Sequence, residues 1–403
     1  MTSAPAVVFD PFSEEYFTNP YNTYRRMRDE APVYHNPQYD FYALTRHADV
    51  ADALKDTETY SSAKGVTLDQ ILLGDDPGGA SIITMDPPEH RRMRSLVNKV
   101  FTPRAIHKLD PLIRKTVHHY LSRVDPIAGF DVISDFAGLF PVEVITTMLG
   151  VPETDRQQIR LWLDTTLERR AGKLGMSRAG VEAMRNTGML YYRLIQQRRA
   201  EPRDDMITAL TTVEVDRDDG TRTSLDDIEI AAFCTLLGGA GAETVTKLIG
   251  NAMVQLARHP QQWHQLKADR AMIPAAIEEV LRFEAPAQYA VRYTHHPVRL
   301  HDTDIPAAKP VLLIEASANR DERAFTNADD FDINRDRSQA QNLGFGYGVH
   351  SCLGAALARA ESAIALEYLL DLLEDYDVDD DRLTRVRMTS VAGWANVPIR
   401  ARP

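Results

Sequence analysis

The sequence Gly344-Phe345-Gly346-Tyr347-Gly348-Val349-His350-Ser351-Cys352-Leu353-Gly354 places one cysteine at the end of a glycine-rich loop, directly before a helix-like run at 355–361. Because glycine has no Cβ and tolerates positive φ, such a loop can fold tightly and let a flat group approach its backbone. A cysteine that enters a helix N-terminus faces unpaired N–H groups and the positive end of the dipole, and both favour the thiolate. The pattern therefore indicates that Cys352 is a ligand or a nucleophile.

The residues leave several roles open for Cys352. A lone cysteine is often a small buried core residue, and a nucleophile would need a histidine and an orienting asparagine or aspartate nearby in the fold. A zinc site is disfavoured because no second cysteine lies at ligand spacing. The glycines read G-x-G-x-G rather than G-x-G-x-x-G and follow no clear strand, so the dinucleotide-binding fingerprint fails. The remaining interpretation is an axial thiolate to haem iron.

The pattern Phe345-x-x-Gly348-x-His350-x-Cys352-x-Gly354 resembles the haem-binding loop of the cytochrome P450 family at every position. The resemblance implies a single-domain fold, mainly α with small β-sheets, in which haem b lies between a long central helix and the cysteine loop of a triangular prism. It also implies that Cys352 binds the iron. Haem contacts are then expected from Phe345, Gly346, His350, Cys352 and Gly354.

Length and composition set the number of domains. The chain has 403 residues, 44% of them hydrophobic, and can bury a large core. Length alone would allow two or three domains, but no linker, repeat or low-complexity tract divides the sequence, so we expect one domain over residues 1–403. The β-rich portion is expected at about 30–46 and 290–320 and in the C-terminal strands, by the same resemblance.

Charge and cysteine content limit the partners and the compartment. The formal net charge of −12 argues against a nucleic-acid partner. Cys234 and Cys352 are too few for a disulfide framework, which suits a reducing cytoplasm. Residues 1–16 contain no apolar run, so we expect neither a signal peptide nor a membrane anchor. We therefore expect a soluble, cytoplasmic, monomeric protein.

The first 85 residues predict short elements and then a long irregular stretch. Helical patterns at 20–30 and 48–55 flank a predicted hairpin of 32–35 and 41–45. Residues 60–85 show little periodicity, and loops of that length are usually functional. By resemblance they roof the substrate pocket, whereas an ordinary surface loop is the alternative. The expected lining residues are Val66, Leu68, Ile71, Leu72 and Ile82.

A helix is predicted to begin within residues 86–94, where prolines and acids precede a basic run. His90 and Arg94 are four residues apart, so they share a face and can grip one anion together. The resemblance identifies that anion as a haem propionate, and a solvated basic face is the alternative. Arg91 and Arg92 point elsewhere and are candidates for contact with a redox partner.

Residues 101–200 predict a succession of packed helices, one of which stops at Gly150-Val151-Pro152. Residues 165–180 include Gly172 and Gly175 and are predicted to be a flexible helix–helix connection. By resemblance this connection is the moving lid of the substrate pocket.

The longest helical pattern runs from Ser224, the predicted N-cap, to Pro260. Its centre holds Gly238, Gly239 and Gly241, and each glycine inside a helix costs about 1 kcal/mol relative to alanine. This cost indicates that something flat or bulky lies against that face. Close helix–helix packing is the alternative.

Glu243 and Thr244 follow these glycines and place an acid and a hydroxyl in an apolar helix. Residues 240–244 resemble the oxygen-activation motif of the P450 family. The resemblance implies that Glu243 and Thr244 deliver protons to bound dioxygen and that Ala240 borders haem and substrate. A hydrogen bond from Thr244 to its own helix carbonyl is the alternative.

Glu279 and Arg282 are three residues apart in a predicted helix and can pair on one face. An isolated E-x-x-R pair is weak evidence. The resemblance implies that this pair is structural, lies buried behind the haem loop and is locked by Arg335.

Strand patterns follow at 290–293, 298–300 and 311–314. By resemblance Arg292 reaches the second propionate of the haem. The C-terminal strands resemble a hairpin whose turn touches substrate. Further substrate contacts are therefore expected from Leu237, Ala240, Ala287, Tyr289, Ala290 and Trp394.

The resemblance implies a haem-thiolate monooxygenase that hydroxylates a hydrophobic small molecule with O2. No flavin or nicotinamide motif is evident, so electrons are expected from a ferredoxin and its reductase, docked near Arg91, Arg92 and Arg359. The expected lining is aliphatic except near Lys64 and Asp69, which favours a lipid, isoprenoid or steroid-like substrate. A peroxygenase that uses hydrogen peroxide and a non-catalytic haem sensor or binding protein are the alternatives. Peroxygenases of the family typically replace the acid–alcohol pair with Arg-Pro, which disfavours the first.

Overall fold

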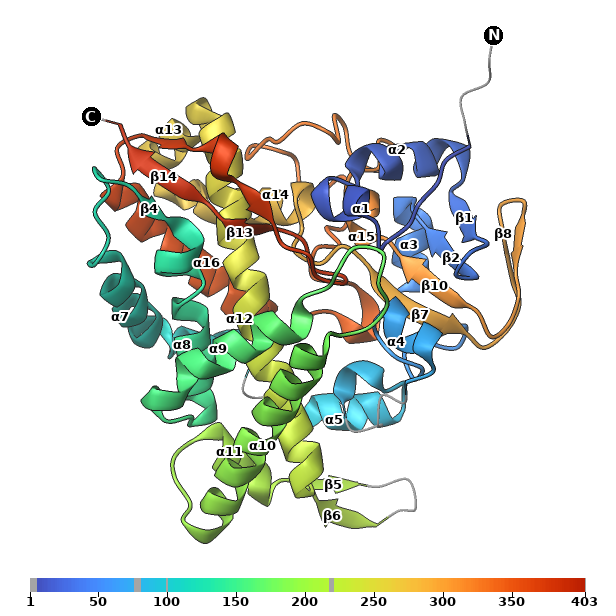
Figure 1. Ribbon diagram of the computed structural model, residues 1–403, viewed down its shortest axis with the longest axis horizontal. Coiled ribbons are helices and arrows are strands. Elements are labelled where there is room, and N and C mark those ends of the chain that lie inside the picture. Colours follow the sequence, from blue (N-terminus) through green and yellow to red (C-terminus); the bar gives the residue numbers. More distant parts are fainter. Residues whose placement is uncertain (1–5, 76–80, 99–100, 217–220, 403) are drawn as a thin grey trace.

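The computed structural model describes residues 6–75, 81–98, 101–216 and 221–402. It is mainly helical with small sheets and is arranged around one long central helix, α12 (Asp227–Arg258) (Figure 1). The other α-helices are α1 (Glu14–Thr18), α2 (Tyr21–Glu30), α3 (His47–Ala53), α4 (Leu68–Leu73), α5 (Glu89–Asn98), α6 (Pro103–His107), α7 (Asp110–Leu121), α8 (Phe140–Leu149), α9 (Glu153–Leu167), α10 (Arg178–Ala200), α11 (Met206–Thr212), α13 (Pro260–Ala268), α14 (Ile273–Phe283), α15 (Glu315–Ala318) and α16 (Ala355–Leu372). The strands are β1 (Val33–Asn36), β2 (Phe41–Leu44), β3 (Tyr60–Ser61), β4 (Phe130–Asp131), β5 (Glu214–Asp216), β6 (Arg222–Ser224), β7 (Ala290–Thr294), β8 (Val298–Leu300), β9 (Thr303–Ile305), β10 (Pro310–Leu313), β11 (Tyr376–Val378), β12 (Thr384–Arg385), β13 (Trp394–Asn396) and β14 (Pro398–Ala401). Shorter helical turns are η1 (Ile82–Thr84), η2 (Val132–Ala137), η3 (Arg270–Met272), η4 (Gly348–His350) and η5 (Asp380–Arg382).

Helix α12 begins at a capping box. The Asp226 carboxylate accepts hydrogen bonds from the N–H groups of Ile228 and Glu229, and the Glu229 carboxylate accepts one from the Asp226 N–H. The prediction that Ser224 caps this helix is wrong, because Ser224 pairs in strand β6 and the chain turns helical only after Asp226. The helix ends at Arg258, before Pro260, as predicted.

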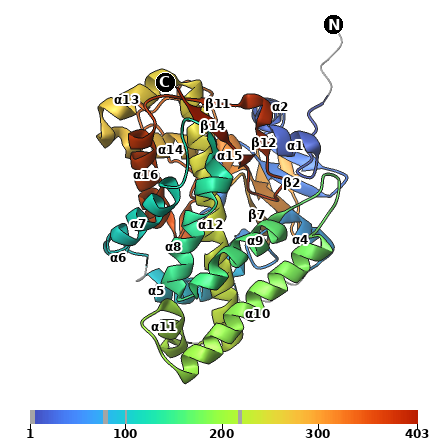
Figure 2. The same cartoon turned by 60° about the vertical axis from the view of Figure 1, so that its left-hand side comes forward.

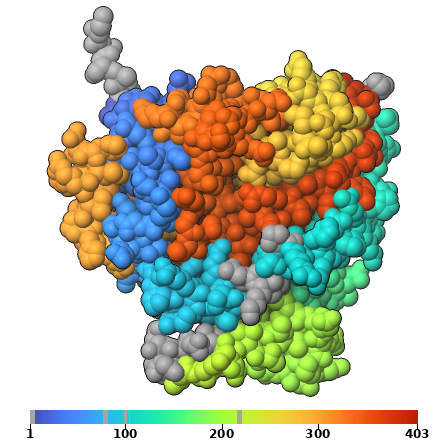
Figure 3. Space-filling view, turned by 180° about the vertical axis from the view of Figure 1, so that it is seen from behind, coloured from blue at the N-terminus to red at the C-terminus, as the bar shows by residue number. Residues whose placement is uncertain are grey.

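Helices α8, α9 and α10 pack against α12, and α10 crosses its N-terminal half (Figure 2). Helices α14 and α16 also pack on α12 and on each other. They form much of the opposite face of the molecule, beside the loop segments that precede the cysteine (Figure 3). Two segments, Val132–Leu149 and Asp227–Arg258, are long and apolar enough to span a membrane by length and composition alone, but both contribute to the hydrophobic core.

A mixed five-stranded sheet has the order β1-β2-β10-β7-β3. The predicted hairpin is confirmed, with Val33 opposite Leu44 and Asn36 opposite Phe41. Because side chains alternate along a strand, Leu312 of β10 joins one apolar cluster and its neighbours Val311 and Leu313 join another. The sheet is therefore covered by apolar side chains on both faces.

The stretch 60–85 contains more regular structure than the sequence predicted. Strand β3, helix α4 and turn η1 lie within it, and the Leu68 side chain is buried. Residues 76–80 lie outside the described part of the chain. Within the acidic run at 374–381, Tyr376 of β11 is buried and donates a hydrogen bond to Met253 O (2.6 Å).

Candidate functional site

The cysteine loop is fixed by its own backbone. The Cys352 N–H donates to Phe345 O (2.8 Å), which closes the loop. Gly346 and Gly348 have φ of +67° and +73°, a region that side chains rarely adopt. A Cβ on Gly348 would lie 2.5 Å from Leu54 O at the end of α3, so only glycine fits there. Helix α16 begins three residues after the cysteine, as predicted.

Behind this loop the structure brings the three predicted structural residues together. Glu279 accepts from Arg282 Nη2 and Nε (2.8 Å each) and from Arg335 Nε (3.1 and 3.2 Å). All three side chains are buried. The same helix, α14, supports the loop, since a Cβ on Gly344 would lie 2.7 Å from Leu281 O. The network therefore locks the segment that carries the cysteine.

Two histidines meet in front of the loop. The rings of His90 and His350 lie 4.2 Å apart, and His350 Nε2 is 3.2 Å from Ser62 Oγ. Neither ring nitrogen of the buried His90 has a hydrogen-bond partner within the described residues. Burial, reinforced by Arg94 and Arg292, lowers the pKa of His90 to about 4 and that of His350 to about 3. Both imidazoles are therefore neutral at pH 7, and the N–H of His90 has no acceptor within the described residues.

Two arginines border the histidine pair. Arg94 donates to Val349 O (3.1 Å) and Ser351 O (2.6 Å) of the cysteine loop. Arg292 is buried in β7 and donates to Val291 O (2.8 Å), and burial lowers the pKa of each guanidinium.

The two histidines and two arginines show whether the chain can hold haem b. A buried donor that lacks a partner is costly, and two cations beside the unpartnered donor of His90 favour an anion with several acceptor oxygens. The two carboxylates of haem b meet that requirement, and the accessible Cys352 thiol lies on the adjoining loop. The residues present fit the group.

The Cys352 thiol is accessible, yet it lies deep enough for burial to raise its pKa. A hydrogen bond from the Gly354 N–H and the charges of Arg94 and Arg359 act in the opposite direction but do not prevail, while Glu315 also raises the pKa. The Gly354 N–H before α16 therefore acts in favour of the thiolate, as expected, but burial outweighs it. A bound metal cation would have to supply the remaining stabilisation.

The glycines in the centre of α12 face crossing helices. A Cβ would lie 2.5 Å from Tyr191 Oη of α10 at Gly238, 3.0 Å from Leu163 Cδ2 of α9 at Gly239, and 3.3 Å from Ile145 Cγ1 of α8 at Gly241. The prediction that a flat group lies against these glycines is wrong, and close helix–helix packing accounts for all three. Glycine here lets three helices approach α12 closely.

The accessible face of α12 lies at Ala240 and Thr244. Ala240 is exposed and Thr244 is partly exposed, although Ala242, Glu243 and Val245 between and beside them are buried. Thr244 Oγ1 donates to Ala240 O (2.8 Å), which is the hydrogen bond named as the alternative. That bond uses the hydroxyl proton and leaves its oxygen free to accept.

Glu243 points to a different side of α12 from Thr244. Its carboxylate pairs with Lys247 Nζ (2.7 Å), and the two side chains are 7% and 5% exposed. The Asp164 carboxyl of α9 lies near it. Burial raises the pKa of Glu243 to about 7; Asp164 adds to the rise and Lys247 opposes it. This acid can therefore hold or release a proton near neutral pH.

An ion pair that the sequence did not predict joins residues 60–85, the expected roof of the substrate pocket, to residues 165–180, the expected lid segment. Asp69 of α4 accepts from Arg169 Nε (2.9 Å), and the side chains are 3% and 7% exposed. Arg169 follows α9 directly, and its Nη1 donates to the backbone oxygens of Thr166, Leu167 and Glu168. The two residues are a hundred positions apart and carry no local pattern, so no sequence signal predicted the pair.

The predicted substrate contacts do not form one cluster. Ile82 and Leu237 belong to the core around α12, Leu72 and Tyr289 to the cluster on one face of the sheet, and Ala290 to the cluster on the other face. Val66 and Ala287 are half-buried, and Ala287 forms a β-bridge with Val391. The Trp394 ring stacks on Arg385 (3.7 Å) and lies near Arg258 (6.0 Å), at the C-terminal end of α12, so the structure does not bring it to Ala240.

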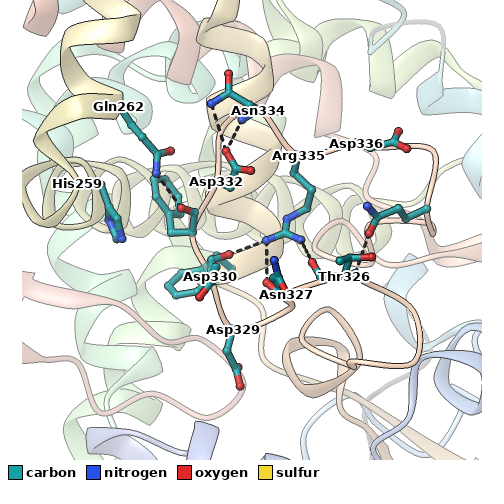
Figure 4. A pocket seen from close by; sticks show the side chains of 13 residues that line it. His259, Gln262, Thr326, Asn327, Asp329, Asp330, Asp332, Asn334, Arg335 and Asp336 are labelled. Carbon is teal, nitrogen blue, oxygen red and sulfur yellow. Dashed lines mark hydrogen bonds between the residues drawn. The ribbon is translucent and has the colours of Figure 1, made fainter.

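An open cavity of about 600 Å³ lies at the loop that carries Arg335, away from the accessible face of α12 (Figure 4). Polar and acidic residues dominate its wall, among them Asp329, Asp330 and Asp332. Arg335 fills its centre and donates to Asn327 O (3.0 Å) and to Thr326 O (2.5 Å). An apolar ligand would find little to contact there, so this cavity is not the candidate active site.

Comparisons with known proteins agree with this geometry. Residues 175–392 match the family model "Cytochrome P450". Cytochrome P450 123 of Mycobacterium tuberculosis is 39% identical over 396 residues, 98% of this chain and 97% of the relative. Among solved structures, a mutant of P450 EryK in complex with erythromycin B has 34% identity and a TM-score of 0.86, covering 94% of this chain and 95% of that one. CYP109E1 from Bacillus megaterium in complex with testosterone has 31% identity and a TM-score of 0.85, covering 96% and 99%.

The enzymes of this family are haem-thiolate oxidoreductases, and the cysteine loop, its buried support and the near-complete coverage by relatives point the same way. The chain belongs to the cytochrome P450 family and is a monooxygenase that holds haem b.

Proposed function

We propose that Cys352 is the thiolate ligand of the haem iron and that the enzyme hydroxylates a hydrophobic small molecule. The observation that carries this assignment is an accessible thiol on a rigid glycine loop, supported from behind by the buried Glu279–Arg282–Arg335 network. When bound, haem supplies the oxygen-activating chemistry, while the protein binds, orients and tunes it.

His90, Arg94, Arg292 and His350 would hold the two propionates. His90 offers a neutral N–H donor that has no partner within the described residues, and Arg292 offers charge. Arg94 already binds two carbonyls of the cysteine loop, so it would couple the haem edge to that loop. Phe345, Gly346 and Gly354 would border the ring on the cysteine side, and Ala240 would border it on the α12 side.

Thr244 and Glu243 would handle the protons of the reaction. The Thr244 hydroxyl donates to Ala240 O, so its oxygen is oriented to accept from a group above the accessible face of α12. Glu243, with a pKa near 7, would replace the proton that is consumed. Lys247 would balance the carboxylate that remains.

The substrate is proposed to be a lipid, isoprenoid or steroid-like molecule. Of the expected lining residues, Ile82 and Leu237 belong to the core around α12, and both are aliphatic. The charge of Asp69 is neutralised by Arg169. Two solved relatives are in complex with erythromycin B and with testosterone, and the second of these is a steroid.

Electrons are proposed to come from a ferredoxin and its reductase in the cytoplasm, with the chain acting as one domain and as a monomer. Arg359 of α16 lies over the Phe345 ring (4.6 Å) and pairs with Glu278 (2.6 Å), so it sits at the surface beside the cysteine loop. With Arg91 and Arg92 it would attract an acidic partner.

The Thr244→Ala variant tests the proton assignment. The variant should bind haem normally, because Thr244 contacts only its own helix carbonyl among the bonds described. With ferredoxin, reductase and testosterone as the probe, it should consume NADPH but release most of the oxygen as hydrogen peroxide. Thr246→Ala is the control, since this buried hydroxyl donates to Ala137 O and Ala242 O. Full product coupling in Thr244→Ala would remove the assignment.

A further inference from the structure

Lys247 of α12 is a buried ammonium that is held from two sides. Its Nζ lies 2.7 Å from the Glu243 carboxylate and donates to Trp394 O (3.2 Å) of β13, and its side chain is 5% exposed. A buried cation is costly unless partners surround it, so these two contacts fix where the ammonium lies. Because one Nζ serves both an acid and a backbone carbonyl, its pairing with Glu243 depends on the position of β13.

The C-terminal hairpin, residues 384–396, also rests on the stem of this lysine. Gly393 has a φ of +155°, and a Cβ there would lie 2.7 Å from Lys247 Cβ, so only a glycine backbone can approach the lysine this closely. The Val386 N–H donates to Gly393 O (3.0 Å) and joins the two strands of the hairpin at this point. Displacement of either strand therefore moves Trp394 O, the carbonyl that holds the ammonium.

The other strand of the hairpin contacts the lid segment. The Arg169 N–H donates to Arg387 O (2.7 Å), and Glu168 forms an antiparallel β-bridge with Met388. Arg387 directly follows the residue that pairs with Gly393. The lid segment and the buried ammonium therefore contact opposite strands of one hairpin, at nearly the same level.

The turn of the hairpin is anchored separately from both contacts. Ser390 O accepts from the Gln288 N–H, and the Ala392 N–H donates to Pro286 O (2.8 Å each). These bonds fix the turn to the segment that leads into β7 and involve neither the lid segment nor α12. A movement of the lid segment is therefore taken up by the strands of the hairpin, which lie between the fixed turn and α12.

Two charged side chains act on Glu243. Burial raises the pKa of Glu243 to about 7; Lys247 on its own helix opposes the rise, and Asp164 of α9, which pairs with Arg160 (3.0 Å), adds to it. A cation held against a carboxyl favours its ionised form. Glu243 therefore releases its proton more readily while Lys247 is held in place, and retains the proton when Lys247 withdraws.

We propose that Lys247 is a positioning residue through which the C-terminal hairpin couples the lid segment to Glu243. With the lid segment placed as in this structure, the hairpin holds Lys247 against Glu243 and favours release of the Glu243 proton. Withdrawal of the lid segment draws the hairpin away from Lys247 and weakens the pair. The inference rests on the proposed role of Glu243 and adds a control of that acid by the lid.

Infrared spectroscopy of the haem-loaded protein tests the role of Lys247 without turnover. The protonated-carboxyl C=O band that disappears in Glu243→Gln identifies Glu243, and its intensity against pH gives a midpoint. Lys247→Gln removes the charge but keeps a donor for Trp394 O, so it should raise the midpoint by at least about one pH unit. An unchanged midpoint would overturn the proposal. Lys247→Met, with the same expectation, takes its place if Lys247→Gln does not fold. Lys267→Gln changes another lysine that binds backbone carbonyls and should leave the midpoint as in the wild type.

The coupling to the lid is tested from the far end of the link. Asp69→Asn weakens the side-chain pair that holds Arg169 and leaves the hairpin and α12 unaltered in sequence. Loss of a negative charge would by itself lower the Glu243 midpoint, whereas release of the lid segment should raise it, by less than Lys247→Gln does. In the Lys247→Gln background, Asp69→Asn should give no rise, because the link is already cut. Asp304→Asn, which breaks an exposed pair with Arg299 (2.9 Å), is the control.

The outcomes separate this inference from the proposed function. No rise in Asp69→Asn, or a rise of equal size with and without Lys247, would overturn the coupling. A rise that requires Lys247, together with full product coupling in Glu243→Gln, would confirm the link and remove Glu243 from the reaction.

Discussion

Two buried ion-pair networks hold opposite parts of this enzyme. Behind the cysteine loop, Glu279 accepts from two arginines, and Arg282 also donates to the backbone oxygens of Asn319, Ala328 and Asp330. At the roof, Asp69 meets Arg169 through one bond between α4 and the lid segment, and the remaining donors of Arg169 serve the end of its own helix.

The difference lies in how many elements each network joins. The Glu279 network ties α14 to several turns of the 319–335 loop at once, so no single movement can release it. The Asp69–Arg169 pair can separate while Arg169 keeps its carbonyl partners. Buried charge therefore makes a permanent support on the side of the cysteine and a releasable contact on the side where substrate must enter.

The largest effect is expected from breaking the permanent support. Arg282→Ala removes the bonds to three loop carbonyls and leaves Glu279 with Arg335 and the Asp332 N–H, so it should lower the free energy of unfolding by about 3–5 kcal/mol and reduce haem content. Urea unfolding and the haem-to-protein ratio measure both. Arg299→Ala, which breaks an exposed pair with Asp304 (2.9 Å), should cost less than about 1 kcal/mol. Equal costs in the two variants would contradict the account.

A smaller, pH-dependent effect is expected at Glu315, a buried acid beside the same cysteine loop. Burial raises the pKa of Glu315 to about 8, and Arg292 opposes the rise. The folded protein therefore holds this proton more tightly than the unfolded chain, and the resulting stability is present at low pH and lost as pH rises towards 8. Glu315→Gln should abolish about 2–3 kcal/mol of the decline in unfolding free energy between pH 5 and 8. A decline of wild-type size in the variant would contradict the prediction.

The smallest effect on stability is expected at the roof. Asp69→Asn should cost about 1–2 kcal/mol, because Arg169 keeps its carbonyl acceptors. It should also speed the entry of 4-phenylimidazole, followed by stopped-flow absorbance, about 3- to 10-fold, since about 1 kcal/mol of the opening barrier is removed. Lys64→Ala, an exposed cation in the same stretch, serves as the control. An unchanged entry rate in Asp69→Asn would show that the pair does not restrain the roof.

The comparison of the Glu279 network with the Asp69–Arg169 pair also shows which parts of the site the sequence predicts. The cysteine loop and the Glu279–Arg282 pair are local patterns. The sequence predicts them because the residues of each pattern lie within a few positions of one another. Arg169 carries no such pattern, because its partner Asp69 lies a hundred residues away and the pair forms only when α4 lies beside the lid segment. The α12 glycines show the limit most clearly, since their spacing indicates a close approach but does not say that Tyr191, Leu163 and Ile145 make it.

The N-cap of α12 was missed for a related reason. Ser224 and Asp226 are both good caps, and only the pairing of Ser224 in the β5–β6 hairpin decides between them. Strand pairing thus decides which of two locally equivalent N-caps is used, whereas a motif such as the cysteine loop can be recognised from the sequence alone.

The central claim, that Cys352 is the thiolate ligand of haem, is tested most directly by the absorption spectrum of the purified protein reduced with dithionite and exposed to carbon monoxide. The account predicts a maximum at about 450 nm, the family's signature of thiolate ligation, and its loss in Cys352→Ala but not in Cys234→Ala. A haem-loaded wild-type protein that absorbs only at about 420 nm, or a Cys352→Ala variant that keeps the wild-type maximum, would contradict it.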